Sequence, residues 1–354
     1  MFEKIRKWKW VLAAAFCVML WAFLPRPFIE QYYSRGFFLL VRKLMDNTFG
    51  YLPFPAYYLF LGFLVLMVVN WILHFFREKP QPFKERIFTI FSFACAMLSF
   101  FFVLWGFNYS RVSVEDQLYL HTKPMSQEVL LEEIKSTSGQ LYNIRTQIMD
   151  SAHSMPQIVF INNIEDNARA AIQETLKEFN FPYDARVRGR FVFEDMFLYW
   201  NVGGQYMPFV GEANVDDGVF PSKKPFYLAH EMAHSFGFTA ESDCNFLAYV
   251  SCVESGKLPF QYSGELNYLL YLLAELKSRD AVLYDSITTD LPVIIRADLE
   301  EIRLHQEKHT YKTGVVGNVV NELYLSALGV EDGIKNYDKM ILLVYEWKAR
   351  KTVN

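Results

Sequence analysis

Apolar positions are concentrated near the start of the chain in three long runs, residues 10–24, 57–76 and 87–105. A helix of about 20 apolar residues crosses the hydrocarbon core of a bilayer. The pattern therefore predicts a membrane anchor over residues 1–108 with three transmembrane helices in contact with the lipid bilayer. The first run is the shortest, and its basic flank also suits a signal peptide, but no small-x-small cleavage site follows it.

Basic residues beside the apolar runs predict the orientation, because Lys and Arg in short loops stay in the cytoplasm. The loop between the second and third runs and the N-terminus are both basic, although residues 25–55 also carry four basic residues. This distribution places the chain after Trp105 outside the cytoplasm. The residues counted are Lys4, Arg6, Lys7, Lys9, Arg77, Lys79, Lys84 and Arg86.

Beyond the third run the spacing of apolar residues changes to that of a water-soluble domain over residues 109–354. Residues 125–152 and 165–180 have the periodicity of amphipathic helices. Residues 157–161, 187–193 and 205–210 are short and strand-like. After Pro225 the pattern is helical almost throughout. A small mixed sheet followed by many helices predicts an α+β fold that is mostly helical.

Charge and cysteine content exclude some functions. The net charge is −4 and the pI is about 6.0, and no long basic run follows the membrane segments. Nucleic acid is therefore not an expected partner. Cys244 and Cys252 lie two turns apart on one expected helix, about 12 Å, which is too far for a disulfide.

The residues that carry chemistry lie in the segment from Pro225 to Gly237. Pro225 suits the first turn of a helix, and Gly237 suits its end. His230 and His234 are four residues apart, so both imidazoles project from one helix face and can share a zinc ion. Glu231 follows the first ligand and can accept a proton from zinc-bound water. The motif can occur by chance, but the helix ends and the apolar residues around it favour a metal site.

A catalytic zinc ion needs a third protein ligand, for which Glu241 is the predicted residue. Gly237 lets the chain reverse, so a helix beginning near Thr239 can aim Glu241 at the metal. Asp243 is the competing ligand, and Asn245 is placed to orient Glu241. The alternative is that Glu241 is not a ligand and only complements the helix dipole from the first turn of that helix. No histidine occupies the position at which short Gly-turn metalloproteases place their third ligand.

With Glu241, the motif resembles the gluzincin class of zinc peptidases, which use two histidines and one glutamate. Met207–Val215, Glu241–Tyr249, Trp105–Tyr109 and the tail from Asn321 to Leu343 resemble a family of bacterial three-span membrane proteins of unassigned function. The resemblance implies a zincin-like metallopeptidase domain in a multi-pass protein of the bacterial inner (plasma) membrane. It implies a peptide or protein substrate without identifying one.

Several further residues are expected at the site from this resemblance. Glu212 and Asn214 line it or hold a turn. Residues 205–210 form the edge strand with which an extended peptide pairs. An oxyanion donor is also expected, and Tyr324 and Tyr337 are candidates for it.

A second histidine pair, His305 and His309, also has i, i+4 spacing. The charged residues around it favour a solvated helix face over a metal site.

The predicted function is a membrane-anchored zinc metallopeptidase that hydrolyses peptide bonds with a Glu231-activated water. Two alternatives stay open at the level of sequence. One is a non-catalytic, zinc-stabilised binding or scaffold domain, in which protein ligands fill every coordination position. The other is a zinc amidase that acts on a cell-envelope component.

Overall fold

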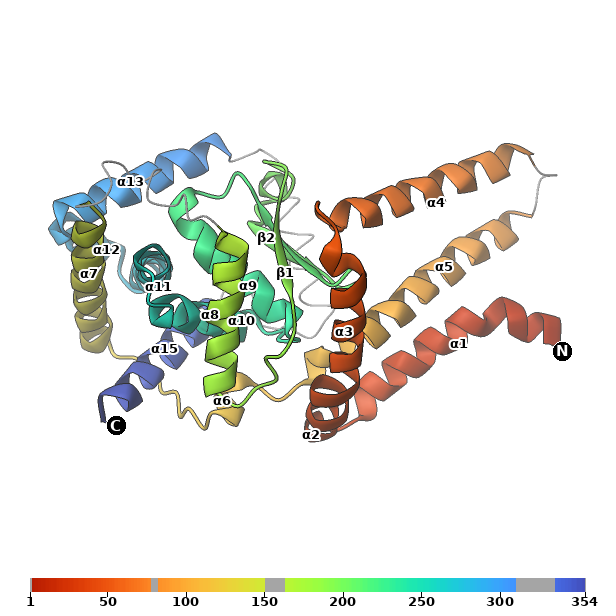
Figure 1. The fold of residues 1–354 in the computed structure, drawn as a ribbon, viewed down its shortest axis with the longest axis horizontal. Coiled ribbons are helices and arrows are strands. Elements are labelled where there is room, and N and C mark those ends of the chain that lie inside the picture. The colour runs from red at the N-terminus through yellow and green to blue at the C-terminus, as the bar shows by residue number, and fades with distance from the viewer. Residues whose placement is uncertain (1, 78–81, 150–162, 310–334, 354) are drawn as a thin grey trace. The chain divides into compact units, whose positions relative to one another are not determined.

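The protein is described by a computed structural model over residues 2–77, 82–149, 163–309 and 335–353. Its contacts divide the chain into two compact units. Unit 1 comprises Met1–Val112 and Met207–Glu212, and unit 2 comprises Ser113–Tyr206 and Ala213–Asn354. Each unit is described by itself below (Figure 1).

Unit 1 is built from helices. They are α1 (Phe2–Phe23), α2 (Arg26–Phe28), the π-helix η1 (Ile29–Phe37), α3 (Phe38–Thr48), the 3₁₀ helix η2 (Phe49–Tyr51), α4 (Tyr57–Arg77), α5 (Phe83–Leu104) and the 3₁₀ helix η3 (Gly106–Ser110).

The membrane prediction is shown only in part, by the length and apolar composition of the helices in unit 1. Among the described residues, α5 is long and apolar enough to cross a membrane. Residues 8–23 and 26–51 meet the same criterion only as a pair, which is bent by 113°. The apolar part of α4, Tyr57–Leu73, is shorter. The structure therefore contains one or two helices capable of spanning a bilayer, and three spans stay a prediction.

The segment between the first two apolar runs is helical, which the sequence analysis did not predict. Buried ion pairs stabilise it. Glu30 accepts from Arg111 at 3.0 Å, and Arg42 pairs with Asp46 at 2.8 Å one helical turn away. Arg42 is one of the four basic residues between the first two apolar runs, and it thus has an acidic partner within unit 1.

Residues Met207–Glu212 belong to unit 1 through contacts with α4. The ring of Phe209 stacks on that of Phe60, with centroids 5.0 Å apart and planes 5° from parallel. The backbone N–H of Tyr57 donates to Oε1 of Glu212 at 3.3 Å. Glu212 therefore holds this segment, which is the second of the two roles expected for it.

Unit 2 contains three strands and most of the remaining helices. The strands are β1 (Arg188–Val192), β2 (Gly204–Met207) and β3 (Glu212–Asp216). The helices are α6 (Val114–Gln117), α7 (Gln127–Met149), α8 (Ile164–Glu178), η5 (Leu198–Trp200), η6 (Pro221–Lys223), α9 (Lys224–Ser235), α10 (Glu241–Glu254), α11 (Leu258–Arg279), α12 (Ala281–Asp290), α13 (Val293–Lys308) and α15 (Lys335–Val353).

The strands form one sheet in the order β1-β3-β2, so β2 lies at an edge. Mostly helical structure with a small mixed sheet confirms the α+β prediction. Residues 187–193 and 205–210 were expected as strands and contain β1 and most of β2, whereas β3 was not predicted. The strand expected over residues 157–161 lies outside the described residues. The sequence of β3, Glu-Ala-Asn-Val-Asp, does alternate between polar and apolar residues, although all five are buried in the structure.

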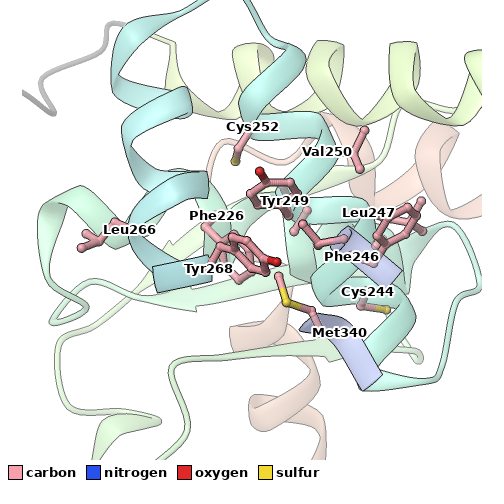
Figure 2. Packing of buried hydrophobic residues seen from close by; sticks show 14 of the residues in the cluster. Phe226, Cys244, Phe246, Leu247, Tyr249, Val250, Cys252, Leu266, Tyr268 and Met340 are labelled. Carbon is pink, nitrogen blue, oxygen red and sulfur yellow. The ribbon is translucent and has the colours of Figure 1, made fainter. Parts of the chain in front are cut away.

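The core of unit 2 is centred on α10 and α11, which pack against α7, α9 and α15 (Figure 1). Nearly every residue of α10 after the first turn is buried. Figure 2 shows Tyr249 of α10 beside Tyr268 of α11, whose ring centroids are 5.0 Å apart. The hydroxyl of Tyr249 donates to Glu265 at 3.0 Å, which satisfies a polar atom inside the core. This packing fixes the beginning of α10, where Glu241 lies.

Candidate metal centre

Helix α9 carries the two histidines, and its ends match the sequence prediction closely. Pro225 lies in the first turn of α9, and the helix ends at Ser235, just before Gly237 with φ of +85°. A left-handed residue at this point turns the chain back, which glycine does at low cost. Leu228, Ala229 and other apolar residues of α9 are fully buried, so the core fixes the orientation of the histidine face.

Glu241 reaches the histidines because α10 begins there. Its carboxylate lies 3.1 Å from Nε2 of His230 and 3.5 Å from Nε2 of His234. The two Nε2 atoms are 3.2 Å apart. His230, His234 and Glu241 form the group of possible metal ligands that the described residues contain.

These three residues have the composition of a zinc site. The 3.1 Å distance joins Nε2 of His230 to Oε2 of Glu241, and the 3.5 Å distance joins Nε2 of His234 to Oε1 of Glu241. With one ligand atom taken from each residue, all three atoms lie within 4.8 Å of one another, so the three residues could hold one ion. Two imidazoles and one carboxylate also form a common ligand set of catalytic zinc. The residues therefore fit the metal in chemistry and in spacing.

A hydrogen bond from the second ring nitrogen orients His234. Its Nδ1 donates to the carbonyl oxygen of Phe238 at 2.8 Å, so Nε2 is the ring nitrogen that faces His230 and Glu241. Sγ of Cys244 lies 3.3 Å from the same Nδ1. Burial raises the pKa of Cys244 to about 11, so its sulfur is a neutral thiol at pH 7. Cys244 therefore packs behind the ligand as a thiol.

The carboxyl group of Glu231 lies against the edge strand β2. A Cβ placed on Gly204 would lie 2.6 Å from Oε1 of Glu231, so the strand backbone approaches the carboxyl closely only because residue 204 is glycine. The backbone of Tyr206 hydrogen-bonds to Glu231. Oε2 of Glu231 is buried and has no hydrogen-bond partner among the described residues. Of the two carboxyl oxygens, β2 thus holds one.

The surroundings of Glu231 favour its protonated form. Burial raises its pKa to about 7, although His230 and His234 act in the opposite direction. Burial also favours the neutral form of Glu241, but attraction to the two imidazoles outweighs this effect and holds the pKa of Glu241 well below its usual range. Two carboxyl groups at one site therefore have strongly different proton affinities. The more basic one suits proton transfer, and the more acidic one suits metal binding.

The raised pKa of Glu231 predicts a pH-dependent stability of the metal-free protein. The folded state keeps the proton up to about pH 7, whereas the unfolded chain loses it near pH 4.5. Stability therefore falls as pH rises between these values. Glutamine does not titrate, so Glu231→Gln does not lose stability in this way. The free energy of unfolding of Glu231→Gln minus that of wild type should therefore increase by up to about 3 kcal/mol from pH 4 to pH 8, at 1.36 kcal/mol per pKa unit.

Denaturant unfolding of the chelator-treated full chain in detergent, at a series of pH values, measures this difference. A constant difference between Glu231→Gln and wild type across the series would contradict the prediction.

The other residues that were expected at the site make different contacts in the structure. Oδ2 of Asp243, the competing ligand, accepts the backbone N–H of Val114 at 3.0 Å, so this oxygen is used in packing. Asn214 lies on β3 and is fully buried, with its amide donating to the carbonyl of Gln205 at 3.4 Å. Asn245 is buried on α10. Tyr324 lies outside the described residues, and so does the side chain of Tyr337.

The expectation of a solvated face for His305 and His309 was wrong. A ring nitrogen of His305 contacts the carbonyl oxygen of Gly218 at 2.7 Å. Nδ1 of His309 contacts the carboxylate of Asp195 at 2.7 Å. Both histidines thus contact loops of the sheet from the C-terminal end of α13, His305 the loop after β3 and His309 the loop after β1. The partners are 87 and 114 residues away in sequence, so helical spacing alone could not reveal them.

Sequence reasoning also missed the groups that support the metal ligands. The carbonyl of Phe238 and the thiol of Cys244 gave no sequence signal as partners of His234, and Gly204 gave only the weak signal of a glycine pair before a strand. These groups act through a backbone atom or through close packing against the site. Residue type alone does not reveal such contacts.

Comparison with known proteins yields one match. The model of a family described as "Protein of unknown function (DUF3810)" matches residues 33–345, which is most of the chain. No curated protein and no solved structure matches.

Proposed function

This chain belongs to the family described as "Protein of unknown function (DUF3810)", and we propose that it is a membrane-anchored zinc peptidase. The observation that carries the proposal is the grouping of His230, His234 and Glu241, whose ligand atoms lie within 4.8 Å of one another, with the buried carboxyl of Glu231 beside them. This set has the composition of a catalytic zinc site with three protein ligands and an open position.

His230, His234 and Glu241 would hold the zinc ion. When bound, the ion lowers the pKa of a coordinated water towards neutrality and polarises the scissile carbonyl group. Glu231 would act as the general base and acid, accepting a proton from the nucleophilic water at Oε2 and donating it to the leaving amine. Its pKa of about 7 before metal binding shows that burial favours the protonated state that this second step requires.

The edge strand β2 supports a peptide as the substrate. An extended peptide can pair with the backbone of an edge strand. Because Gly204 and Tyr206 of β2 contact Glu231, a peptide on this strand passes the catalytic carboxyl. The basic residues near the apolar runs favour a location of unit 2 outside the cytoplasm of a bacterial cell.

A zinc-stabilised scaffold would fill the coordination sphere with four protein ligands. The cluster in the described part of the chain contains three such residues, which favours the enzyme.

The metal content of the purified full chain tests the proposal. We expect about one zinc ion per wild-type chain and a strongly reduced content in His230→Ala, because two remaining ligands rarely retain zinc. His305→Ala is the matched control, since its histidine lies on α13 and contacts the carbonyl of Gly218. Equal zinc in wild type and His230→Ala, measured by elemental analysis after dialysis, would remove the basis of the proposal.

A further inference from the structure

Lys223, the last residue of η6, is a buried lysine that forms no ion pair with the described residues. Only 8% of its surface is exposed. Its neighbour Lys224 differs, because the ammonium of Lys224 lies 2.6 Å from the carboxylate of Asp217. Lysine is rarely buried without a partner, since a charge that leaves water needs compensation. The charge of Lys223 therefore lacks the carboxylate that would normally accompany it.

The ammonium of Lys223 lies over the ring of Tyr227, 5.2 Å from the ring centroid. This cation–π contact is the interaction that the described part of the chain gives to the charge. It uses the face of the ring and provides no acceptor for the three N–H donors of the ammonium. The nitrogen is not among the atoms that are sealed from solvent. A ligand can therefore reach the ammonium while the contact with Tyr227 persists.

Tyr227 connects Lys223 to the metal centre. Lys223 has helical backbone angles and precedes α9, so Lys223, Tyr227 and Glu231, four residues apart, lie along one helix face. The ring of Tyr227 packs over Gly203, where an added Cβ would lie 2.1 Å from the ring. Glu231 packs in the same way against Gly204, the next residue. This row of side chains thus runs beside the beginning of the edge strand β2.

The ammonium lies at a distance from Glu231 that a short peptide spans. The four residues from Tyr227 to Glu231 correspond to a rise of about 6 Å along the helix. The ammonium lies 5.2 Å from the centroid of the Tyr227 ring. Since an extended peptide advances about 3.3 Å per residue, a substrate group at Lys223 is roughly two to three residues from the scissile bond.

We propose that Lys223 binds a carboxylate of the peptide substrate and thereby determines specificity. The inference rests on the proposed function, because it places a peptide along β2 with the scissile bond beside Glu231. A carboxylate completes the missing ion pair and accepts the N–H donors of the ammonium. Two groups of a peptide have this chemistry. The C-terminal carboxylate makes the enzyme an exopeptidase, and an acidic side chain makes it an endopeptidase selective for acidic sequences.

Peptide binding to the zinc-loaded full chain in detergent, with Glu231→Gln to prevent turnover, tests the inference. The probes are three fluorescent hexapeptide mixtures of neutral residues, one with a free C-terminal carboxylate, one with a C-terminal amide, and one amidated with a single Glu. We expect a carboxylate-bearing mixture to bind about 10-fold or more tightly than the neutral amide mixture, as for a charge-assisted hydrogen bond. The mixture that does so identifies the source of the carboxylate.

Adding Lys223→Met should abolish this preference and leave the affinity for the neutral amide mixture unchanged. Methionine keeps an unbranched apolar side chain but has no charge. Lys223→Arg keeps the charge and should retain the preference. Lys224→Met is the matched control, because it removes the same charge one residue away. Its ion pair with Asp217 is at the surface, so the preference should stay within about 2-fold.

Equal affinity of the parent chain for all three mixtures would overturn the inference. So would a Lys223→Met variant that keeps the preference, or one that loses affinity equally for all three mixtures, which would indicate a role in packing alone. Zinc content shows that each variant retains the metal centre. Hydrolysis of the same mixtures by the chain with Glu231 intact tests the proposed function separately, so the two failures are distinguishable.

Discussion

Glu231→Gln is expected to reduce peptide hydrolysis by about 10²–10⁴-fold, the usual contribution of a general base. Glutamine has nearly the same shape as glutamate but does not accept the proton of the nucleophilic water. The contact with β2 should persist, because an amide oxygen still accepts a hydrogen bond from the backbone. The measurement is kcat/KM of the zinc-loaded full chain on a mixture of quenched fluorescent peptides.

The zinc content of Glu231→Gln should equal that of wild type, since Glu231 is not among the predicted ligands. This control separates a loss of chemistry from a loss of metal. Retention of full activity with full zinc would contradict the assigned role of Glu231. Loss of both activity and zinc would instead mean that Glu231 helps to hold the metal.

Glu241→Gln is expected to weaken zinc binding by more than about 100-fold, since even residues that only support a ligand contribute 10–100-fold. The carboxylate of Glu241 supplies the negative charge closest to the two imidazoles, at 3.1 and 3.5 Å. A neutral amide lacks this charge and is a poor zinc ligand. Competition with a zinc-binding dye at fixed pH measures the affinity.

Asp243→Asn is the matched control for Glu241→Gln, because both carboxylates lie in the first turn of α10. Asn still accepts the backbone N–H of Val114, so this variant should fold and bind zinc as wild type does. If Asp243→Asn lost zinc and Glu241→Gln kept it, the third ligand would be Asp243.

Much of the candidate site is predictable because its geometry is local. The i, i+4 spacing of His230 and His234 puts both rings on one face of any α-helix, whatever the rest of the fold does. Pro225 and Gly237 mark the helix ends for equally local reasons of backbone conformation. Glu241 was a weaker prediction, because its approach depends on the path of the chain after Gly237.

Unit 1 illustrates what the sequence analysis did not predict. The apolar runs predicted helices, and α1, α4 and α5 occupy those regions. The segment after Pro25 was not predicted to be helical, although its buried residues Ile29, Tyr33, Phe38, Val41 and Met45 recur at helical spacing. Ion pairs such as Glu30 with Arg111, 81 residues apart, stabilise it, and a sliding window cannot detect such partners.

The sequence by itself determined the helix that carries His230 and His234, the order of apolar and polar segments, and the α+β composition, because these depend on spacing within one element. Only the tertiary structure decided which carboxylate of α10 faces the histidines, since Val114 takes an oxygen of Asp243 from 129 residues away. It likewise brought Gly204 of β2 against Glu231 and held the loop that follows β1 on the carboxylate of Asp216. These contacts join residues through packing and backbone atoms, whose partners no local pattern specifies.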